Sequence, residues 1–101
     1  MMEFAAKKSE LQEFGKKVVK IANREILLVR IKGEIYACEN ECPHQGAPLS
    51  ASIVNREASI SCPRHGYRFS LIDGSCTEHP ELKLQIYRLN VEGDDIFIKT
   101  D

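Results

Sequence analysis

The chain has 101 residues, enough for one small domain and too few for a second catalytic domain beside it. Its 14 basic and 15 acidic residues give a net charge of −1, which offers no basis for binding nucleic acid or an anionic membrane surface. The longest apolar run, residues 26–29, is too short to cross a bilayer and the start does not have the order of a secretory signal, so we expect one cytoplasmic domain over residues 1–101.

Short strands and turns follow one another along most of the chain. The first predicted element is a helical turn at residues 9–13. Strands are then predicted at residues 16–21, 25–31 and 35–38, joined by Ala22-Asn23-Arg24 and Lys32-Gly33-Glu34 as the turns of two successive hairpins.

The strand predicted at residues 25–31 has an alternating pattern. Leu27, Val29 and Ile31 alternate with Leu28 and Arg30. Because successive side chains of a strand point to opposite faces, this pattern predicts one buried face and one mixed face.

Two more hairpins are predicted further along the chain. Residues 53–54 and 58–61 flank a turn at 55–57, and residues 84–91 and 96–100 flank Glu92-Gly93-Asp94-Asp95. With so little helix, the pattern as a whole predicts a small all-β domain.

Two mixed pairs of cysteine and histidine lie in the segments between the strands. The first pair is Cys42-Pro43-His44 and the second is Cys62-Pro63-Arg64-His65, each followed by a glycine within two positions. Each pair offers one thiolate and one imidazole. Two such loops meeting at their tips would give one iron two sulfurs and the other iron two nitrogens, which is the ligation of a Rieske [2Fe–2S] centre.

The segments around these pairs resemble the two cluster loops of Rieske ferredoxins. The resemblance covers residues 42–49 and 62–69 with the following Asp73-Gly74, and outside about 38–80 it extends only to the strand pattern. It implies an all-β Rieske fold of antiparallel sheets, with a cluster-binding subdomain at about residues 42–70 inserted in a base.

The resemblance also implies one [2Fe–2S] cluster per chain. In Rieske ferredoxins the residues that match Cys42 and Cys62 hold the inner iron, and those that match His44 and His65 hold the outer iron at the surface. The same comparison gives a role to the loop glycines, since Gly46 and Gly66 have no Cβ and let backbone N–H groups approach the sulfurs. Pro43 and Pro63 fix φ after each cysteine.

A structural zinc site is the alternative for the same four residues, since two cysteines and two histidines also suit tetrahedral Zn²⁺. Zinc sites usually group like ligands, as Cys-x₂₋₄-Cys followed by His-x₃₋₅-His, whereas each pair here is mixed. The sequence therefore favours the cluster, with a zinc-stabilised interaction module as the alternative. A cysteine nucleophile is disfavoured because no partner base can be singled out.

The resemblance also predicts a low reduction potential. In the high-potential branch of the family a disulfide ties the loops together, and a serine and a tyrosine hydroxyl donate hydrogen bonds to a bridging sulfide and to a cysteine sulfur. The positions that match the disulfide here look like Ala47 and Arg64, and those that match the hydroxyls look like Tyr67 and Phe69. Since all four groups are replaced, we expect a potential near the low end of the Rieske range.

Five other residues need an interpretation. Cys38 lies in an apolar strand pattern, where a buried thiol acts as a small hydrophobe, while a disulfide between Cys38 and Cys76 is disfavoured in a reducing compartment. His79 is interpreted as an exposed loop histidine, with a position beside the cluster as the alternative. Arg64 and Arg68 bracket a predicted ligand and are either ordinary surface residues or a positive rim that steers an acidic partner.

The function that the resemblance implies is a soluble one-electron carrier. It would take electrons from a flavin-type reductase and pass them to a terminal oxygenase or similar enzyme, without catalysis of its own. The alternative within the family is a small subunit of a larger enzyme, such as NADH-dependent nitrite reductase. The sequence names neither the donor nor the acceptor.

Overall fold

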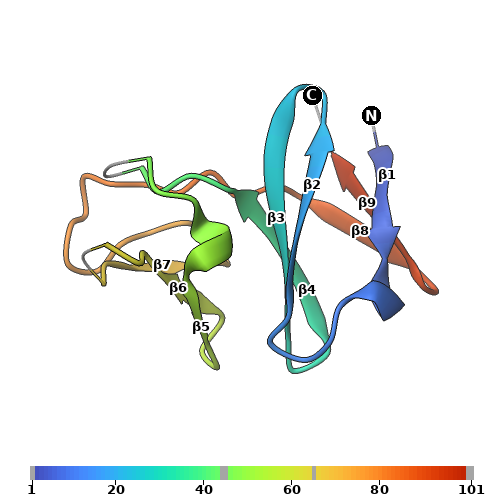
Figure 1. The fold of residues 1–101 in the computed structure, drawn as a ribbon, viewed down its shortest axis with the longest axis horizontal. Helices are drawn as coiled ribbons and strands as arrows, with labels where there is room; N and C mark the ends of the chain where they lie inside the picture. The colour runs from blue at the N-terminus through green and yellow to red at the C-terminus, as the bar shows by residue number, and fades with distance from the viewer. Residues whose placement is uncertain (1, 44–45, 65, 100–101) are drawn as a thin grey trace.

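The computed structural model describes residues 2–43, 46–64 and 66–99. In this part of the chain nine strands form three antiparallel sheets (Figure 1). The elements are β1 (Met2–Lys7), η1 (Lys8–Glu10), β2 (Lys16–Ile21), β3 (Arg24–Ile31), β4 (Glu34–Glu39), η2 (Leu49–Ala51), β5 (Ile53–Asn55), β6 (Ser59–Ser61), β7 (Arg68–Ser70), β8 (Leu89–Glu92) and β9 (Asp95–Lys99). The all-β prediction is confirmed, and no helix among the described residues is long and apolar enough to span a membrane.

The β2-β3-β4 sheet is built from the two predicted hairpins. Ala22 and Asn23 have φ values of 53° and 63°, and Lys32 and Gly33 have φ values of 52° and 80°. Two successive residues with positive φ are typical of the tight turns whose twist matches a hairpin. Each turn therefore fixes the pairing on both sides of it, and Val29 lies opposite both Lys16 and Tyr36.

Strand β3 packs against a core on each face, and the face predicted to be mixed is buried at Ile26 and Leu28 but only half-buried at Arg30. Leu27 and Val29 lie in the core that extends to the β5-β6-β7 sheet, while Ile26 and Leu28 lie in a second core with Ile96 and other residues of β1 and β9. Because this part of the sheet is packed on both sides, residues 26–29 of β3 form a continuous apolar run.

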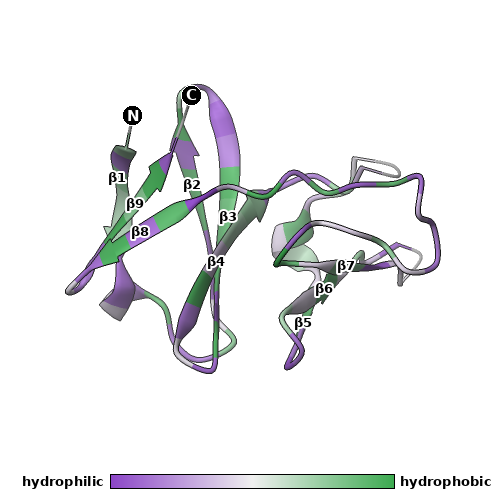
Figure 2. Cartoon of the chain, turned by 180° about the vertical axis from the view of Figure 1, so that it is seen from behind, coloured by the Kyte–Doolittle hydropathy of each residue, from purple (hydrophilic) through white to green (hydrophobic). Residues whose placement is uncertain are grey.

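The β1-β9-β8 sheet forms the base of the molecule together with β2-β3-β4, and the sequence pattern did not predict its first strand. β1 pairs with β9, with Phe4 opposite Phe97 and a bulge at Ala5, so the two ends of the described chain lie side by side. In Figure 2, β9 is mostly hydrophobic, and its residues Ile96 and Ile98 are fully buried.

The hairpin predicted near the end of the chain is confirmed, but its first strand is shorter than expected. Only Leu89–Glu92 forms the ladder with β9. The preceding segment makes isolated bridges instead, with Lys83 opposite Ser75 and Ile86 opposite Cys38. This segment thus connects the β5-β6-β7 end of the molecule to the base (Figure 2).

The β5-β6-β7 sheet lies apart from the two base sheets, at the other end of the molecule (Figure 1). Its β5-β6 hairpin was predicted, whereas β7 was not, because it follows the second Cys/His pair directly. The helical turn expected at 9–13 is a single 3₁₀ turn at Lys8–Glu10, and a second such turn, η2, precedes β5.

Candidate metal centre

The segments that contain Cys42 and Cys62 fold into two loops with the same backbone hydrogen bonds. In the first loop the N–H of Gly46 donates to the carbonyl of Cys42 at 2.7 Å, and the N–H of Cys42 donates to the carbonyl of Ala47 at 2.8 Å. In the second loop the corresponding bonds, from Gly66 to Cys62 and from Cys62 to Tyr67, measure 2.9 and 2.8 Å. Each loop is therefore closed at its cysteine by the same pair of backbone hydrogen bonds.

The glycine that closes each loop has a left-handed backbone. Gly46 has a φ of 73° and Gly66 has a φ of 70°, and residues other than glycine rarely adopt this backbone conformation. The resemblance implies a different role for these glycines, the close approach of N–H groups to sulfur. The turn geometry supplies a second reason for glycine at both positions.

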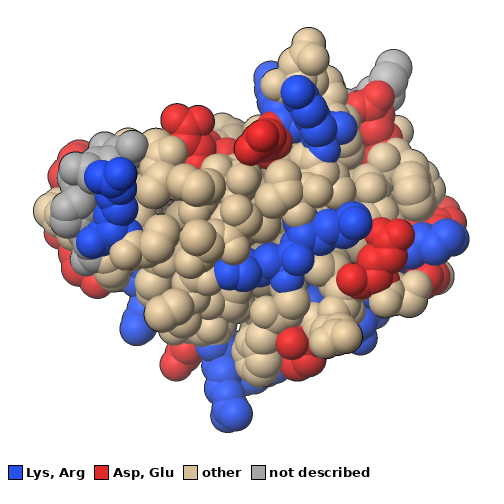
Figure 3. Space-filling model, viewed as in Figure 1, with Lys and Arg blue, Asp and Glu red and all other residues tan. Residues whose placement is uncertain are grey.

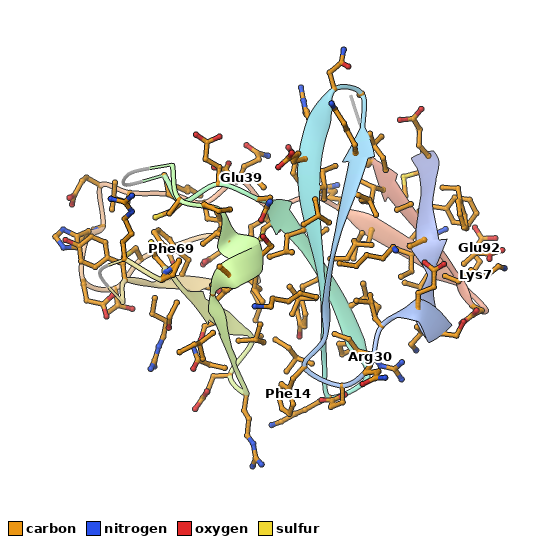
Figure 4. All side chains as sticks on the ribbon, in the orientation of Figure 1. Lys7, Phe14, Arg30, Glu39, Phe69 and Glu92 are labelled. Carbon is orange, nitrogen blue, oxygen red and sulfur yellow. The ribbon has the colours of Figure 1, made fainter. Side chains whose placement is uncertain are left out.

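Both loop cysteines are buried in one hydrophobic core. Cys42 is 1% exposed and Cys62 is 2% exposed, and they share this core with Leu49, Ile60 and Phe69. Phe69 points from β7 into the interior between the loops and the base (Figure 4). The two predicted thiolate ligands therefore lie on the inner side of their loops, away from solvent.

The two predicted histidine ligands, His44 and His65, lie outside the described residues. Among the residues that are described, no three cysteine, histidine or carboxylate side chains are grouped as metal ligands. In the sequence, His44 and His65 fall between the cysteine and the glycine that close each loop.

Asn40 fixes the first loop to its surroundings, a role that the sequence analysis did not predict. Its side-chain oxygen accepts a hydrogen bond from the backbone N–H of Ser50 at 2.7 Å. Its backbone N–H donates to the backbone carbonyl of Glu25 at 3.1 Å. Asn40 is 8% exposed. An asparagine close before the loop was the available signal, because such side chains often bond to nearby backbone groups.

A third segment, residues 76–82, lies beside the second loop. The rings of His79 and Tyr67 have centroids 4.2 Å apart, and Glu78 accepts a hydrogen bond from the N–H of Arg68 at 3.5 Å. The Nδ1 atom of His79 also lies 3.2 Å from Oε2 of Glu81. His79 is half-buried against the second loop, which fits the alternative interpretation, a position beside the candidate centre.

One of the two arginines near the second pair, Arg68, has an acidic neighbour. Arg64 and Arg68 are exposed, and Arg68 lies close enough to Glu78 to help lower the pKa of that carboxyl group, after its backbone hydrogen bonds. On the face drawn in Figure 3, basic and acidic side chains are interspersed. The charges at this end thus partly compensate one another.

Cys38 and Cys76 are both buried and are not joined by a disulfide. Burial, helped by nearby Glu39, raises the pKa of the Cys38 thiol to about 12. Burial is also the main cause that raises the pKa of Cys76. The interpretation of Cys38 as a small hydrophobic residue in the core is therefore confirmed.

We expect Cys38 to resist alkylation in the folded protein. Since its pKa lies near 12, almost no thiolate forms at pH 8, and the thiolate is the form that reacts. Iodoacetamide labelling followed by peptide mass spectrometry should leave Cys38 unmodified in native protein and label it fully after denaturation. Equal labelling in both states would contradict the burial of this thiol.

Comparison with known proteins gives a family and several relatives. A family model described as the Rieske [2Fe–2S] domain matches residues 2–88. The 3-phenylpropionate/cinnamic acid dioxygenase ferredoxin subunit of Escherichia coli K12 is 36% identical over 74 residues, covering 72% of this chain and 70% of that protein. Human apoptosis-inducing factor 3 is 29% identical over 91 residues, and the match covers 89% of this chain but only 15% of that longer protein.

Solved structures share the fold over the whole chain. The ferredoxin of carbazole 1,9a-dioxygenase from Nocardioides aromaticivorans IC177 superimposes with a TM-score of 0.90 at 25% identity, covering 100% of this chain and 99% of that one. A protein described as an NADH-dependent nitrite reductase small subunit from Mycobacterium tuberculosis has a TM-score of 0.90 at 24% identity, covering 100% and 96% of the two chains. At that identity the second likeness concerns the fold alone.

Proposed function

This chain belongs to the Rieske [2Fe–2S] domain family, and on that basis we propose that it is a one-electron carrier whose cluster is held by Cys42, His44, Cys62 and His65. One cluster per chain is proposed, because the sequence has one such set of four residues. The cluster, when bound, takes up and releases one electron. The chain is an electron-transfer protein and not itself an enzyme.

The observation that carries this proposal is the matched pair of loops. Each is closed by the same two hydrogen bonds at a buried cysteine, although the histidine follows the first cysteine by two positions and the second by three. Buried thiols suit the inner iron, which stays away from solvent, and each proposed histidine ligand follows its cysteine closely in the sequence. The donor set of these residues thus fits the cluster.

We propose a flavin-type reductase as the electron donor and a terminal oxygenase as the acceptor. The acceptor is supported by the E. coli relative, which is named as a ferredoxin subunit of a dioxygenase and is covered over 70% of its length. The nitrite reductase small subunit stays the second candidate, supported by the shared fold. The cytoplasmic location also stays a prediction.

Spectroscopy on the purified protein tests the cluster. We expect the iron and sulfide content of one [2Fe–2S] cluster per chain, visible absorption, and an electron paramagnetic resonance signal after reduction with the low average g value of mixed nitrogen and sulfur ligation. Stoichiometric zinc with no visible absorption would instead establish the zinc-stabilised module and overturn the proposal.

The proposed partners need a separate measurement. Protein reduced with dithionite should be reoxidised rapidly and stoichiometrically by a Rieske-type terminal oxygenase, and a flavin-dependent ferredoxin reductase with NADH should reduce it. Co-purification in a fixed ratio with a larger oxidoreductase, with no exchange of the chain between complexes, would favour the resident subunit over the carrier.

We expect a reduction potential near the low end of the Rieske range of about −150 to +300 mV. Phe69 has no hydroxyl group and is fully buried, so it cannot donate the hydrogen bond that a tyrosine donates in the high-potential branch, and Tyr67 stands where that branch has a shorter serine. Redox titration should show a potential that rises in the double variant Tyr67→Ser with Phe69→Tyr. A wild-type potential above about +100 mV, or no rise in the variant, would contradict this expectation.

A further inference from the structure

The two cysteine loops differ in what holds their bases together. Strand β6 pairs with β7 immediately before and after the second loop, with Ser61 opposite Arg68, so that loop continues a strand ladder. The first loop leaves β4 after Glu39 and returns to η2, and no strand pairing among the described residues joins these two segments. The base of the first loop therefore depends on another contact.

The side chain of Asn40 supplies that contact. Its oxygen accepts the hydrogen bond from the Ser50 N–H at 2.7 Å, which joins residues 40 and 50. This bond lies in the sequence just outside the one between the Cys42 N–H and the Ala47 carbonyl, so the two bonds are nested like successive rungs of a ladder. A side chain thus takes the place of one rung of a strand pair.

Asn40 is itself fixed to the base of the molecule. Its backbone N–H donates to the Glu25 carbonyl at 3.1 Å, and its Nδ2 atom donates to Oε1 of Glu25 at 3.3 Å. These partners set the orientation of the amide, because its oxygen can only accept and its nitrogen can only donate. Asn40 therefore links the beginning of β3 to η2.

The η2 turn extends this link to the core around the cysteines. Its first residue, Leu49, is fully buried in the core that also contains Cys42 and Cys62. Lys16 of β2 donates a hydrogen bond to the carbonyl of Ser52, and η2 lies between the β5-β6-β7 sheet and the base (Figure 1). This second tie should keep the segment folded when Asn40 is replaced.

We propose that Asn40 is a positioning residue for Cys42 and determines how firmly the first loop holds the cluster. The inference rests on the proposed function, since it takes Cys42 as a ligand of the inner iron. Groups that orient metal ligands typically change metal affinity by about tenfold or more when they are replaced. Because the second loop has a strand ladder at its base, the effect of Asn40 is confined to the first loop.

The test is hydrogen exchange of the cluster-loaded protein, measured by mass spectrometry at single-residue resolution. In Asn40→Ala the N–H groups that close the first loop, at residues 42 and 46, should exchange about fivefold faster or more, as expected for the loss of one hydrogen bond. Those that close the second loop, at residues 62 and 66, should keep their wild-type rates. Iron should be released to EDTA about tenfold faster. Equal acceleration in both loops, or in neither, would overturn the proposal.

A double variant provides the rescue. Asn40→Asp alone keeps an acceptor for the Ser50 N–H but places a carboxylate against Glu25. Adding Glu25→Gln exchanges donor and acceptor in this pair and leaves the net charge of the protein unchanged. The double variant should restore exchange and iron release to within about twofold of wild type. If Asn40→Ala does not fold, this pair decides, since a double variant whose first loop exchanges as fast as in Asn40→Asp would contradict the assigned role.

Ile98→Val is the matched control for stability. It removes one carbon from the second core, which contains neither loop cysteine, and should lower the melting temperature while both loops keep their exchange rates. Iron release as fast as in Asn40→Ala would show an effect of overall stability and would refute the positioning role. The exchange rates decide the role of Asn40 whatever metal the loops hold, while iron and sulfide analysis of the same sample decides the proposed function.

Discussion

The variants Cys42→Ala and Cys62→Ala are each expected to lose the cluster completely. Both thiols are buried at the closing hydrogen bonds of their loops, so no solvent ligand can replace them without opening the core. Because a bound metal centre contributes to folding, the variants should also melt at a lower temperature than the loaded wild type. The measurements are iron and sulfide content, visible absorption and circular dichroism. His44→Ala and His65→Ala should likewise lack the intact cluster.

Cys38→Ala and Cys76→Ala are the matched controls, since each removes a buried thiol from the same core without removing a proposed ligand. Both should bind a full complement of iron and show the wild-type electron paramagnetic resonance spectrum. A normal spectrum in both histidine variants would eliminate the site assignment, and so would loss of the cluster only in the controls.

Replacing Gly74 with alanine is expected to destabilise the fold strongly. Gly74 has a φ of +83°, and a Cβ on it would lie 2.1 Å from the carbonyl oxygen of Leu84, an impossible contact with backbone. The same two residues are joined by the bond from the Leu84 N–H to the Gly74 carbonyl at 2.9 Å, so the segment must move to admit the methyl group. Left-handed strain and overpacking together should cost about 2–5 kcal/mol.

Gly33→Ala separates these two costs. Gly33 has a nearly equal φ of +80°, but nothing lies within 4 Å of the position its Cβ would occupy. The Gly33→Ala variant should therefore lose only the stability that left-handed strain costs, about 1–2 kcal/mol. Melting temperatures of both variants, measured with the cluster bound, should differ by many degrees, since about 1 kcal/mol shifts a domain of this size by roughly 4–8 °C. Equal losses would show that the contact with Leu84 is not decisive.

The local sequence determined the features that depend on neighbours in the chain. Tight turns at residues 22–23 and 32–33 and the turn before β9 were predicted from their residues, because such turns depend on a few backbone angles. The two mixed Cys/His pairs indicated the family, because the residue types and their spacing can be recognised without the structure. The burial of Cys38 also followed from the apolar residues around it.

The tertiary structure decided what depends on residues that meet from distant parts of the chain. Strand β1 exists because it pairs with β9, and neither its turns nor its pattern marks it in the sequence. Ile26 and Leu28 are buried because the β1-β9-β8 sheet covers them, which alternation within β3 cannot reveal. The same holds for the bond from the Ser50 N–H to Asn40. Long-range pairing is set by the packing of whole sheets, so no local pattern determines it.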